Sequence, residues 1–201
     1  MTKKTIFYLA FFASLVIIFY VVMINVTSIA EEKLPPLNLV RPFSFVRQDG
    51  KTISEKDVVG KTYIAEYFFT TCKGICPKMN KNMQLIYNQL KDQKNFMVLS
   101  HTVDPETDSV PVIKRYADSI GASVENWWFL TGTKENLYKT ARESYLLDDP
   151  QNSSKNIKEQ FIHTQFFALV DKGGQVRGIY DGLKKDEVDQ LISDTKMLLS
   201  N

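Results

Sequence analysis

Cys72 and Cys76 are the only cysteines in this chain of 201 residues. They lie four residues apart, after an apolar run at 62–69 and before a helix-like run at 77–93. Because four residues make about one helical turn, a helix capped by Cys72 would place both sulfurs on the same side of its first turn. Helix N-termini favour negative charge, so we expect both thiolates to form easily there. Two accessible thiolates either exchange electrons as a dithiol and a disulfide or hold a soft metal ion.

The elements that must position this pair follow from the apolar pattern. Strands are predicted at 43–46, 62–69, 96–103, 127–130, 164–170 and 175–180, and helices at 77–93, 112–120, 133–145 and 188–199. The polar stretch 147–158 is predicted to be a mobile insertion. This order predicts an α/β domain with a mixed, mainly parallel sheet and helices on both faces. Such sheets bind ligands at the carboxyl ends of their strands, where Cys72 and Asp104 fall.

The N-terminal segment decides which compartment the thiols meet. Lys3 and Lys4 precede a run without charge, from Thr5 to Ala30, and its core at 6–24 is long enough to span a bilayer. The apolar part of a cleaved signal peptide is usually shorter, about 7 to 15 residues, although 28–30 resembles a cleavage site. We therefore expect a retained transmembrane helix within 1–30, a linker at 31–40 and one domain at 41–201.

Charge indicates the orientation of the chain and limits its partners. Basic residues lie before the span and Glu31 and Glu32 follow it, so the positive-inside rule leaves the N-terminus in the cytoplasm. The expected location is a bacterial plasma (inner) membrane, crossed once, with the domain on the extracytoplasmic side. Without Lys3 and Lys4, the 25 basic residues become 23, equal to the 23 acidic ones. A neutral domain without a basic stripe is not expected to bind nucleic acid.

Three motifs together resemble the Sco/SenC family, copper-binding proteins of the thioredoxin-like superfamily. The first is the cysteine loop 70–77, Thr-Thr-Cys-Lys-Gly-Ile-Cys-Pro, with three residues between the cysteines where thioredoxins have two. The second is the acidic turn 103–108, which begins Val-Asp-Pro-Glu. The third is His163, which opens the apolar run ending at Asp171. The resemblance covers about residues 40 to 195, and it implies a thioredoxin-like fold.

The resemblance also implies a function. Family members bind one copper ion through two cysteines and one histidine, which are Cys72, Cys76 and His163 in this chain. They assist assembly of the copper centre of cytochrome c oxidase, whose copper-bearing subunit is the expected partner beside other copper- or thiol-exchange proteins. We therefore expect a membrane-anchored copper metallochaperone. The alternative is a thiol-disulfide oxidoreductase that keeps the oxidase cysteines reduced.

Three further residues have two readings each. Glu66 interrupts an apolar strand at the distance before the first cysteine where thioredoxins carry a buried acid. It is either a buried proton carrier with a raised pKa or a side chain that reaches solvent beside a basic residue. His101 is either an auxiliary ligand or a strand-end histidine without a role. Asp104 is either a neighbour of the copper loop or a turn-former.

Two other readings of the cysteines carry less weight. A structural disulfide across so short a loop would add roughly 2 kcal/mol, and a domain of this size does not depend on it. A thiol peroxidase would share the fold, but no proline precedes Cys72 at the expected place, and a second cysteine one turn away does not suit its usual resolving arrangement.

Overall fold

The computed structural model describes residues 3–29, 34–162 and 164–200. The chain divides into two compact units, Met1–Pro35 and Pro36–Asn201. The first unit holds one helix, α1 (Lys3–Ile29). Within α1, Lys4–Val22 is long and apolar enough to cross a membrane, judged by length and composition.

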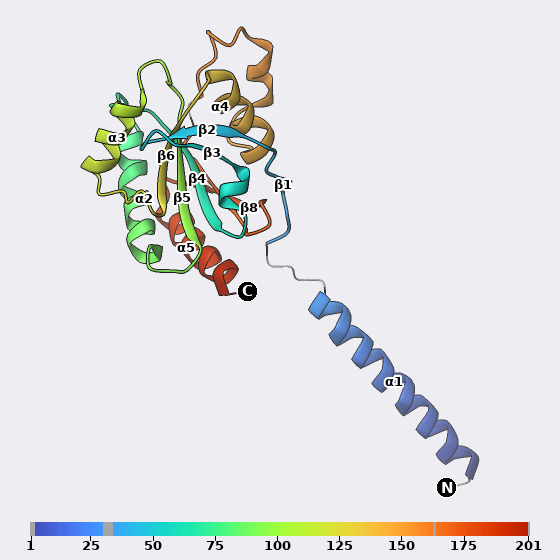
Figure 1. Cartoon of the computed structure of the whole chain (residues 1–201). Helices are drawn as coiled ribbons and strands as arrows, with labels where there is room; N and C mark the ends of the chain where they lie inside the picture. The colour runs from blue at the N-terminus through green and yellow to red at the C-terminus, as the bar shows by residue number, and fades with distance from the viewer. Residues whose placement is uncertain (1–2, 30–33, 163, 201) are drawn as a thin grey trace. The chain divides into compact units, whose positions relative to one another are not determined.

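The second unit is an α/β domain around one mixed sheet (Figure 1). Its strands lie in the order β1-β8-β7-β4-β5-β6-β2-β3. The strands are β1 (Asn38–Leu39), β2 (Ser44–Arg47), β3 (Thr52–Ser54), β4 (Thr62–Phe68), β5 (Phe96–Thr102), β6 (Trp127–Thr131), β7 (Phe166–Val170) and β8 (Gln175–Asp181). The helices are α2 (Cys76–Leu90), α3 (Val110–Ser119), α4 (Lys134–Thr140) and α5 (Lys185–Ser200), with the shorter turns η1 (Glu55–Val58), η2 (Ala141–Tyr145) and η3 (Pro150–Ser154).

Strands β4 and β5 form the buried centre of the sheet, and every residue of both is buried. They pair in parallel, with Glu66 opposite Ser100 and Tyr67 opposite His101. Since side chains alternate along a strand, Tyr67 and His101 face one layer while Glu66 and Ser100 face the other. The predicted mixed sheet at the centre of the domain is therefore confirmed.

Helices cover both faces of this sheet, as predicted. On the face of Tyr67, the core contains Leu137, Tyr138 and Ala141 from α4 and η2. On the opposite face, the ring of Phe68 stacks on Tyr116 of α3 at 5.5 Å. Helix α2 presents a buried apolar row to the same layer, formed by Met79, Met83, Ile86 and Leu90.

The prediction of a mainly parallel sheet is wrong. Among the described residues, only the β4–β5 and β5–β6 pairs are parallel, while five pairs are antiparallel. Two causes explain the difference. Strand β2 turns back to pair antiparallel with β6, and the two- and three-residue strands β1 and β3 exist only through pairing with their neighbours.

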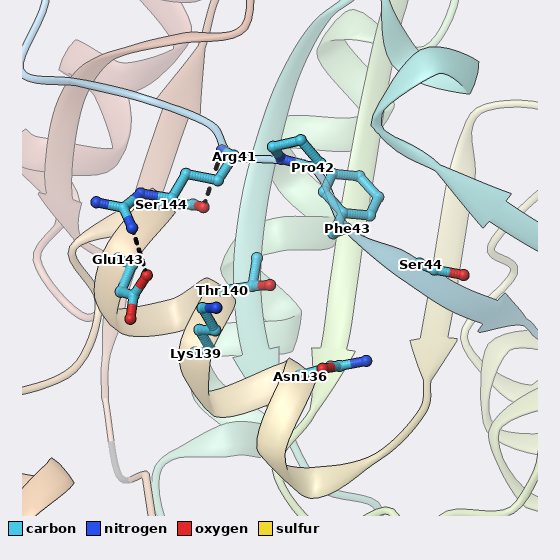
Figure 2. A pocket seen from close by; sticks show the side chains of 9 residues that line it. All are labelled: Arg41, Pro42, Phe43, Ser44, Asn136, Lys139, Thr140, Glu143 and Ser144. Carbon is cyan, nitrogen blue, oxygen red and sulfur yellow. Dashed lines mark hydrogen bonds and ion pairs between the residues drawn. The ribbon is translucent and has the colours of Figure 1, made fainter.

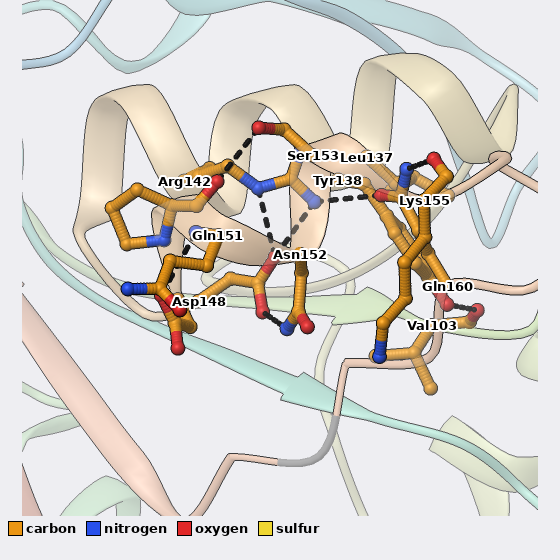
Figure 3. Close-up of polar contacts among 12 residues, drawn as sticks. Val103, Leu137, Tyr138, Arg142, Asp148, Gln151, Asn152, Ser153, Lys155 and Gln160 are labelled. Carbon is orange, nitrogen blue, oxygen red and sulfur yellow. Dashed lines mark hydrogen bonds and ion pairs between the residues drawn. The ribbon is translucent and has the colours of Figure 1, made fainter.

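The segment 147–158 is anchored, which corrects the prediction of a mobile insertion. Arg142 forms an ion pair with Asp148 at 2.7 Å, and both side chains are largely buried. Asn152 donates to the same carboxylate at 2.8 Å, and Arg142 also donates to Gln160 at 2.8 Å (Figure 3). Removing one partner of a buried charge pair is costly, so this network fixes the polar stretch against η2.

Candidate thiol and metal site

The cysteine loop lies where β4 ends and α2 begins. Helix α2 starts at Cys76, close to the predicted start, with Ile75 as its N-cap and proline in its first turn. Cys72 therefore precedes the helix, and the condition that it caps the helix is not met. The Cys72 N–H donates to the Phe69 carbonyl at 3.3 Å, which turns the chain back after the strand. Cys72 is partly exposed, Cys76 is buried, and both are free thiols.

The two thiols differ in acidity. Burial opposes ionisation of Cys72, but hydrogen bonds from the Cys76 thiol and from the backbone N–H groups of Cys76, Gly74 and Ile75 outweigh it, so the pKa of Cys72 is lowered. Burial raises the pKa of Cys76, and the hydrogen bond to Cys72 and the negative charges of Cys72 and Glu66 raise it further. The expectation of an easily formed thiolate therefore holds for Cys72 and is wrong for Cys76.

Asp108 joins the cysteine loop to the neighbouring strand. Its side chain is fully buried in the turn after β5. It accepts hydrogen bonds from the N–H of Thr70 at 3.2 Å, from the hydroxyl of Thr70 and from the hydroxyl of Thr102. Thr70 stands two residues before Cys72, so this carboxylate fixes the start of the loop. Sequence reasoning named Asp104 from the same turn and missed Asp108, because two aspartates in one turn look alike until their burial is known.

Asp104 serves the turn itself. Its N–H donates to the Thr102 hydroxyl at 2.9 Å, and its carbonyl accepts from the N–H of Asp108 at 2.8 Å. Its carboxylate accepts only a long hydrogen bond from Thr107, at 3.4 Å, among the contacts described. These contacts match the turn-forming reading, and a supporting role at the copper loop stays a prediction.

Glu66 lies completely buried in β4 on the face covered by α2. Its Oε1 accepts from the Ser100 hydroxyl at 2.6 Å, and Ser100 accepts from the indole N–H of Trp127 at 2.9 Å. Its Oε2 has no hydrogen-bond partner within the described part of the chain. Burial raises the pKa of Glu66 to about 7, against the opposing hydrogen bond from Ser100. The reading in which Glu66 reaches solvent is therefore wrong.

His101 lies on the other face of the sheet, among aromatic rings. Its ring stacks on Tyr67 at 5.0 Å and meets the rings of Phe45 and Tyr145 at 5.3 Å each. It is fully buried, and burial lowers its pKa to about 4 despite hydrogen bonding to the Glu66 and Leu99 backbone. We therefore assign it to the core as a neutral histidine.

His163, the predicted third ligand, lies outside the described residues. Its neighbours on the N-terminal side approach the cysteine loop, since the ring of Phe161 meets the ring of Phe69 edge-on at 5.3 Å. Within the part of the chain that the structure describes, no three Cys, His, Asp or Glu side chains are grouped as a metal site. Of the three predicted copper ligands, Cys72 and Cys76 are the two that lie among the described residues. Thiolates favour soft ions such as Cu(I).

Comparison with known proteins identifies relatives over most of the chain. Residues 31–200 match the family model described as SCO1/SenC. The SCO1 protein homolog of Bacillus subtilis (strain 168) is 34% identical over 166 residues, which cover 80% of this chain and 83% of that protein.

Solved structures agree with this match. BsSco, described as a member of the Sco family of cytochrome c oxidase assembly proteins with a disulfide switch, superposes with a TM-score of 0.69 at 33% identity, covering 83% of this chain and 97% of that one. Yeast Sco1 with copper bound superposes with a TM-score of 0.61 at 27% identity, covering 79% and 89%. The thioredoxin-like fold implied by the sequence motifs is thereby confirmed.

Asp108→Asn should destabilise the domain and loosen the cysteine loop. The asparagine side chain replaces one acceptor oxygen with an NH₂ group, which cannot accept the hydrogen bonds that Thr70 and Thr102 donate to the carboxylate. We therefore expect a loss of roughly 2 kcal/mol in the free energy of unfolding. Urea unfolding of the full chain in detergent measures this loss, and hydrogen exchange of the Thr70 amide should accelerate. Asp104→Asn is the matched control from the same turn. Equal effects of the two substitutions would contradict the assigned role of Asp108.

Glu66 should make stability depend on pH. Its pKa is 4.5 in the unfolded chain and about 7 in the folded one, so the folded state holds the proton more tightly. The stabilisation is complete below about pH 4.5 and is lost as pH rises through 7, by about 3 kcal/mol in total.

Urea unfolding of the native chain and Glu66→Gln at pH 5 and pH 8 tests this effect. We expect the variant to gain relative stability at pH 8, since glutamine carries no charge to bury. The lowered pKa of His101 has the opposite effect on the free energy of unfolding, which decreases as pH falls from 6.5 towards 4. Because both proteins contain His101, this contribution cancels when they are compared at the same pH. A difference between the two proteins that stays constant across this range would refute the buried acid.

Proposed function

This chain belongs to the SCO1/SenC family, and we propose that it is a membrane-anchored metallochaperone that binds one copper ion through Cys72, Cys76 and His163. In this proposal it assists assembly of the copper centre of cytochrome c oxidase. The observation that carries the proposal is the meeting of two thiols, one of them acidic, at a partly exposed loop where the central strand ends.

The chemistry of the donors supports copper as cargo. Two thiolates suit Cu(I), and an added imidazole lets the same site accept Cu(II). A structural zinc site usually takes four protein ligands, while this chain holds two cysteines and two histidines, and His101 is enclosed in the core. A partly exposed site with three donors also leaves room for a recipient to take the metal. The relative from yeast was solved with copper bound.

The proposed topology places this site outside the cytoplasm. We infer a cytoplasmic tip and transmembrane anchor within 1–30, a linker at 31–40 and the copper-binding domain at 41–201, in a bacterial plasma membrane. The apolar stretch of α1 supports the anchor. In this proposal, the protein delivers its copper ion to the copper-bearing subunit of the oxidase.

Copper binding by the full chain in detergent tests the proposal. Loading with Cu(II) should produce a thiolate-to-copper charge-transfer band, lost in Cys72→Ser/Cys76→Ser and lost or shifted in His163→Ala. His101→Phe is the matched control, because it replaces the other histidine with a ring suited to its aromatic surroundings. Binding should weaken in acid, since protons compete for the thiols. A chain that binds copper no better than the double serine variant would overturn the proposal.

A second candidate is a thiol-disulfide oxidoreductase that reduces cysteines of the oxidase. The unequal thiols and the buried Glu66 favour it. The Cys72 thiolate would attack a disulfide sulfur of the oxidase and release one thiolate. Cys76 would then give up its proton and attack Cys72, forming the Cys72–Cys76 disulfide and releasing the second thiolate. Ionised Glu66, whose charge acts on Cys76, is suited to receive that proton because its pKa is about 7.

This mechanism predicts that Cys72 reacts first. With iodoacetamide at pH 7, we expect Cys72 to be alkylated at least about tenfold faster than Cys76, because the thiolate is the reactive form. Peptide mapping by mass spectrometry reads both rates in one sample. In the urea-unfolded chain the two rates should converge, which provides the control. Faster alkylation of Cys76 in the folded protein would exclude Cys72 as the attacking thiol.

A further inference from the structure

Polar contacts tie segments of the domain together that are far apart in the sequence. One set lies where the chain enters the domain. There Arg41 forms an ion pair with Glu143 at 2.6 Å, and its N–H donates to the Ser144 hydroxyl at 3.1 Å, beside a cavity of about 360 Å³ (Figure 2). These contacts hold the entering chain against η2. Another set lies after β8, and it joins the segment that follows His163 to the helix that begins at Cys76.

The turn after β8 lies at the same edge of the sheet as the cysteine loop. Strand β7 runs antiparallel to β4, with Ala65 opposite Ala168. The start of β7 therefore lies beside the end of β4, from which the cysteine loop leaves. Because β8 is antiparallel to β7, its last residue, Asp181, pairs with the first residue of β7, Phe166, at this edge. Gly182 follows directly.

Gly182 connects α2 to the start of β7 through its own backbone. Its N–H donates to the Gln165 carbonyl at 2.8 Å, and its carbonyl accepts from the side-chain amide of Asn82 at 2.7 Å. Asn82 belongs to α2 and lies six residues after Cys76, about 9 Å along the helix. We define the Gly182 bridge as Asn82, Gln165, Asp181 and Gly182.

Asp181 fastens the same segment a second time. Its carboxylate is buried, and it accepts from the side chain of Gln165 at 2.6 Å and from the N–H of Leu183 at 2.9 Å. The turn therefore holds both the main chain and the side chain of Gln165. Hydrogen bonds to a buried carboxylate are costly to break, so Gln165 has little freedom to move away from the turn.

The close approach at Gly182 leaves no room for a side chain. A Cβ atom there would lie 2.6 Å from Cζ of Phe167 and 2.9 Å from the carbonyl oxygen of Gln165. The ring of Phe167 is fully buried, and the Gln165 carbonyl is the group that accepts from Gly182. Because a packed interior yields little, alanine at this position would push the turn away from β7 and lengthen that hydrogen bond.

We propose that the Gly182 bridge positions the imidazole donor of the copper site relative to the two thiols. The inference rests on the proposed function, in which Cys72, Cys76 and His163 bind one ion. Gln165 follows His163 by two residues, a length of chain that spans at most about 7 Å. The bridge fixes Gln165 to α2, and α2 begins at Cys76, so the two ligand-bearing segments share one connection.

This role makes the bridge more important for Cu(II) than for Cu(I). Two thiolates already suit Cu(I), whereas the imidazole is the donor that suits the site to Cu(II). Contacts that orient a metal ligand typically contribute tenfold or more to affinity. Loosening the bridge should therefore lower the affinity for Cu(II) more than the affinity for Cu(I).

Asn82→Ala tests the bridge in the full chain in detergent. Gln84→Ala is the matched control, because Gln84 is also half-buried on α2 and its side-chain amide donates to the Ile120 carbonyl, just after α3, at 3.0 Å. We expect Asn82→Ala to lower the affinity for Cu(II) about tenfold in a chelator competition and to shift the imidazole nitrogen signals in pulsed EPR of the Cu(II) form. Gln84→Ala should change neither. In the metal-free chain, hydrogen exchange of the Gly182 amide should accelerate in Asn82→Ala and not in Gln84→Ala.

Gly182→Ala is a second variant, which should produce the same changes at greater size, and urea unfolding shows whether each variant is folded. If the parent shows imidazole signals and Asn82→Ala matches Gln84→Ala in Cu(II) affinity and in these signals, the inference is overturned while the proposed function stands. A parent spectrum without imidazole signals, or signals that persist in His163→Ala, would instead overturn the proposed ligand set and the inference with it.

Discussion

The hydrogen bonds that converge on the buried carboxylate of Asp108 are the interaction on which the rest of the site depends. The ends of β4 and β5 must stay together for the chain to present Cys72 and Cys76 at one edge of the sheet. Asp108 accomplishes this by accepting from Thr70, on the loop after β4, and from Thr102, the last residue of β5. A buried charge needs such partners, so the loop and the turn stabilise each other.

The surroundings of Cys72 and Cys76 give the two thiols different acidities. Loop N–H groups surround the more exposed Cys72, while the low polarity around Cys76 and the charge of Glu66 hold the proton on the second sulfur. The same asymmetry serves both candidate functions. A metal ion would bind Cys72 first and displace the proton of Cys76 afterwards. The disulfide of a partner protein would likewise react with Cys72 before Cys76. Copper carriage and thiol exchange, the two candidate functions, would therefore use one arrangement, and the family includes a protein with a disulfide switch.

The sequence predicted the parts of this arrangement that depend on local pattern. The apolar run of β4, interrupted only by Glu66 after Thr62, and the spacing of Met79, Met83, Ile86 and Leu90 in α2 determine those elements without knowledge of their neighbours. The pattern did not reveal β1 and β3, because the two residues of β1 become a strand only by pairing with the distant β8, and the three residues of β3 only by pairing with β2. The polar composition of 147–158 did not predict that this segment is anchored through Asp148. The ion pair with Arg142 anchors it because both side chains are largely buried, and the sequence does not give their burial. The choice between Asp104 and Asp108, and between the two readings of Glu66, also depended on burial, which composition does not encode.

The central claim is that both sulfurs and the imidazole of His163 bind the same ion. X-ray absorption at the copper edge, recorded on the full chain loaded with Cu(I), counts the atoms in the first coordination shell. The account predicts two sulfur neighbours and one nitrogen with the outer-shell scattering of an imidazole ring. A shell with a single sulfur, or one built only from oxygen and nitrogen, would contradict it.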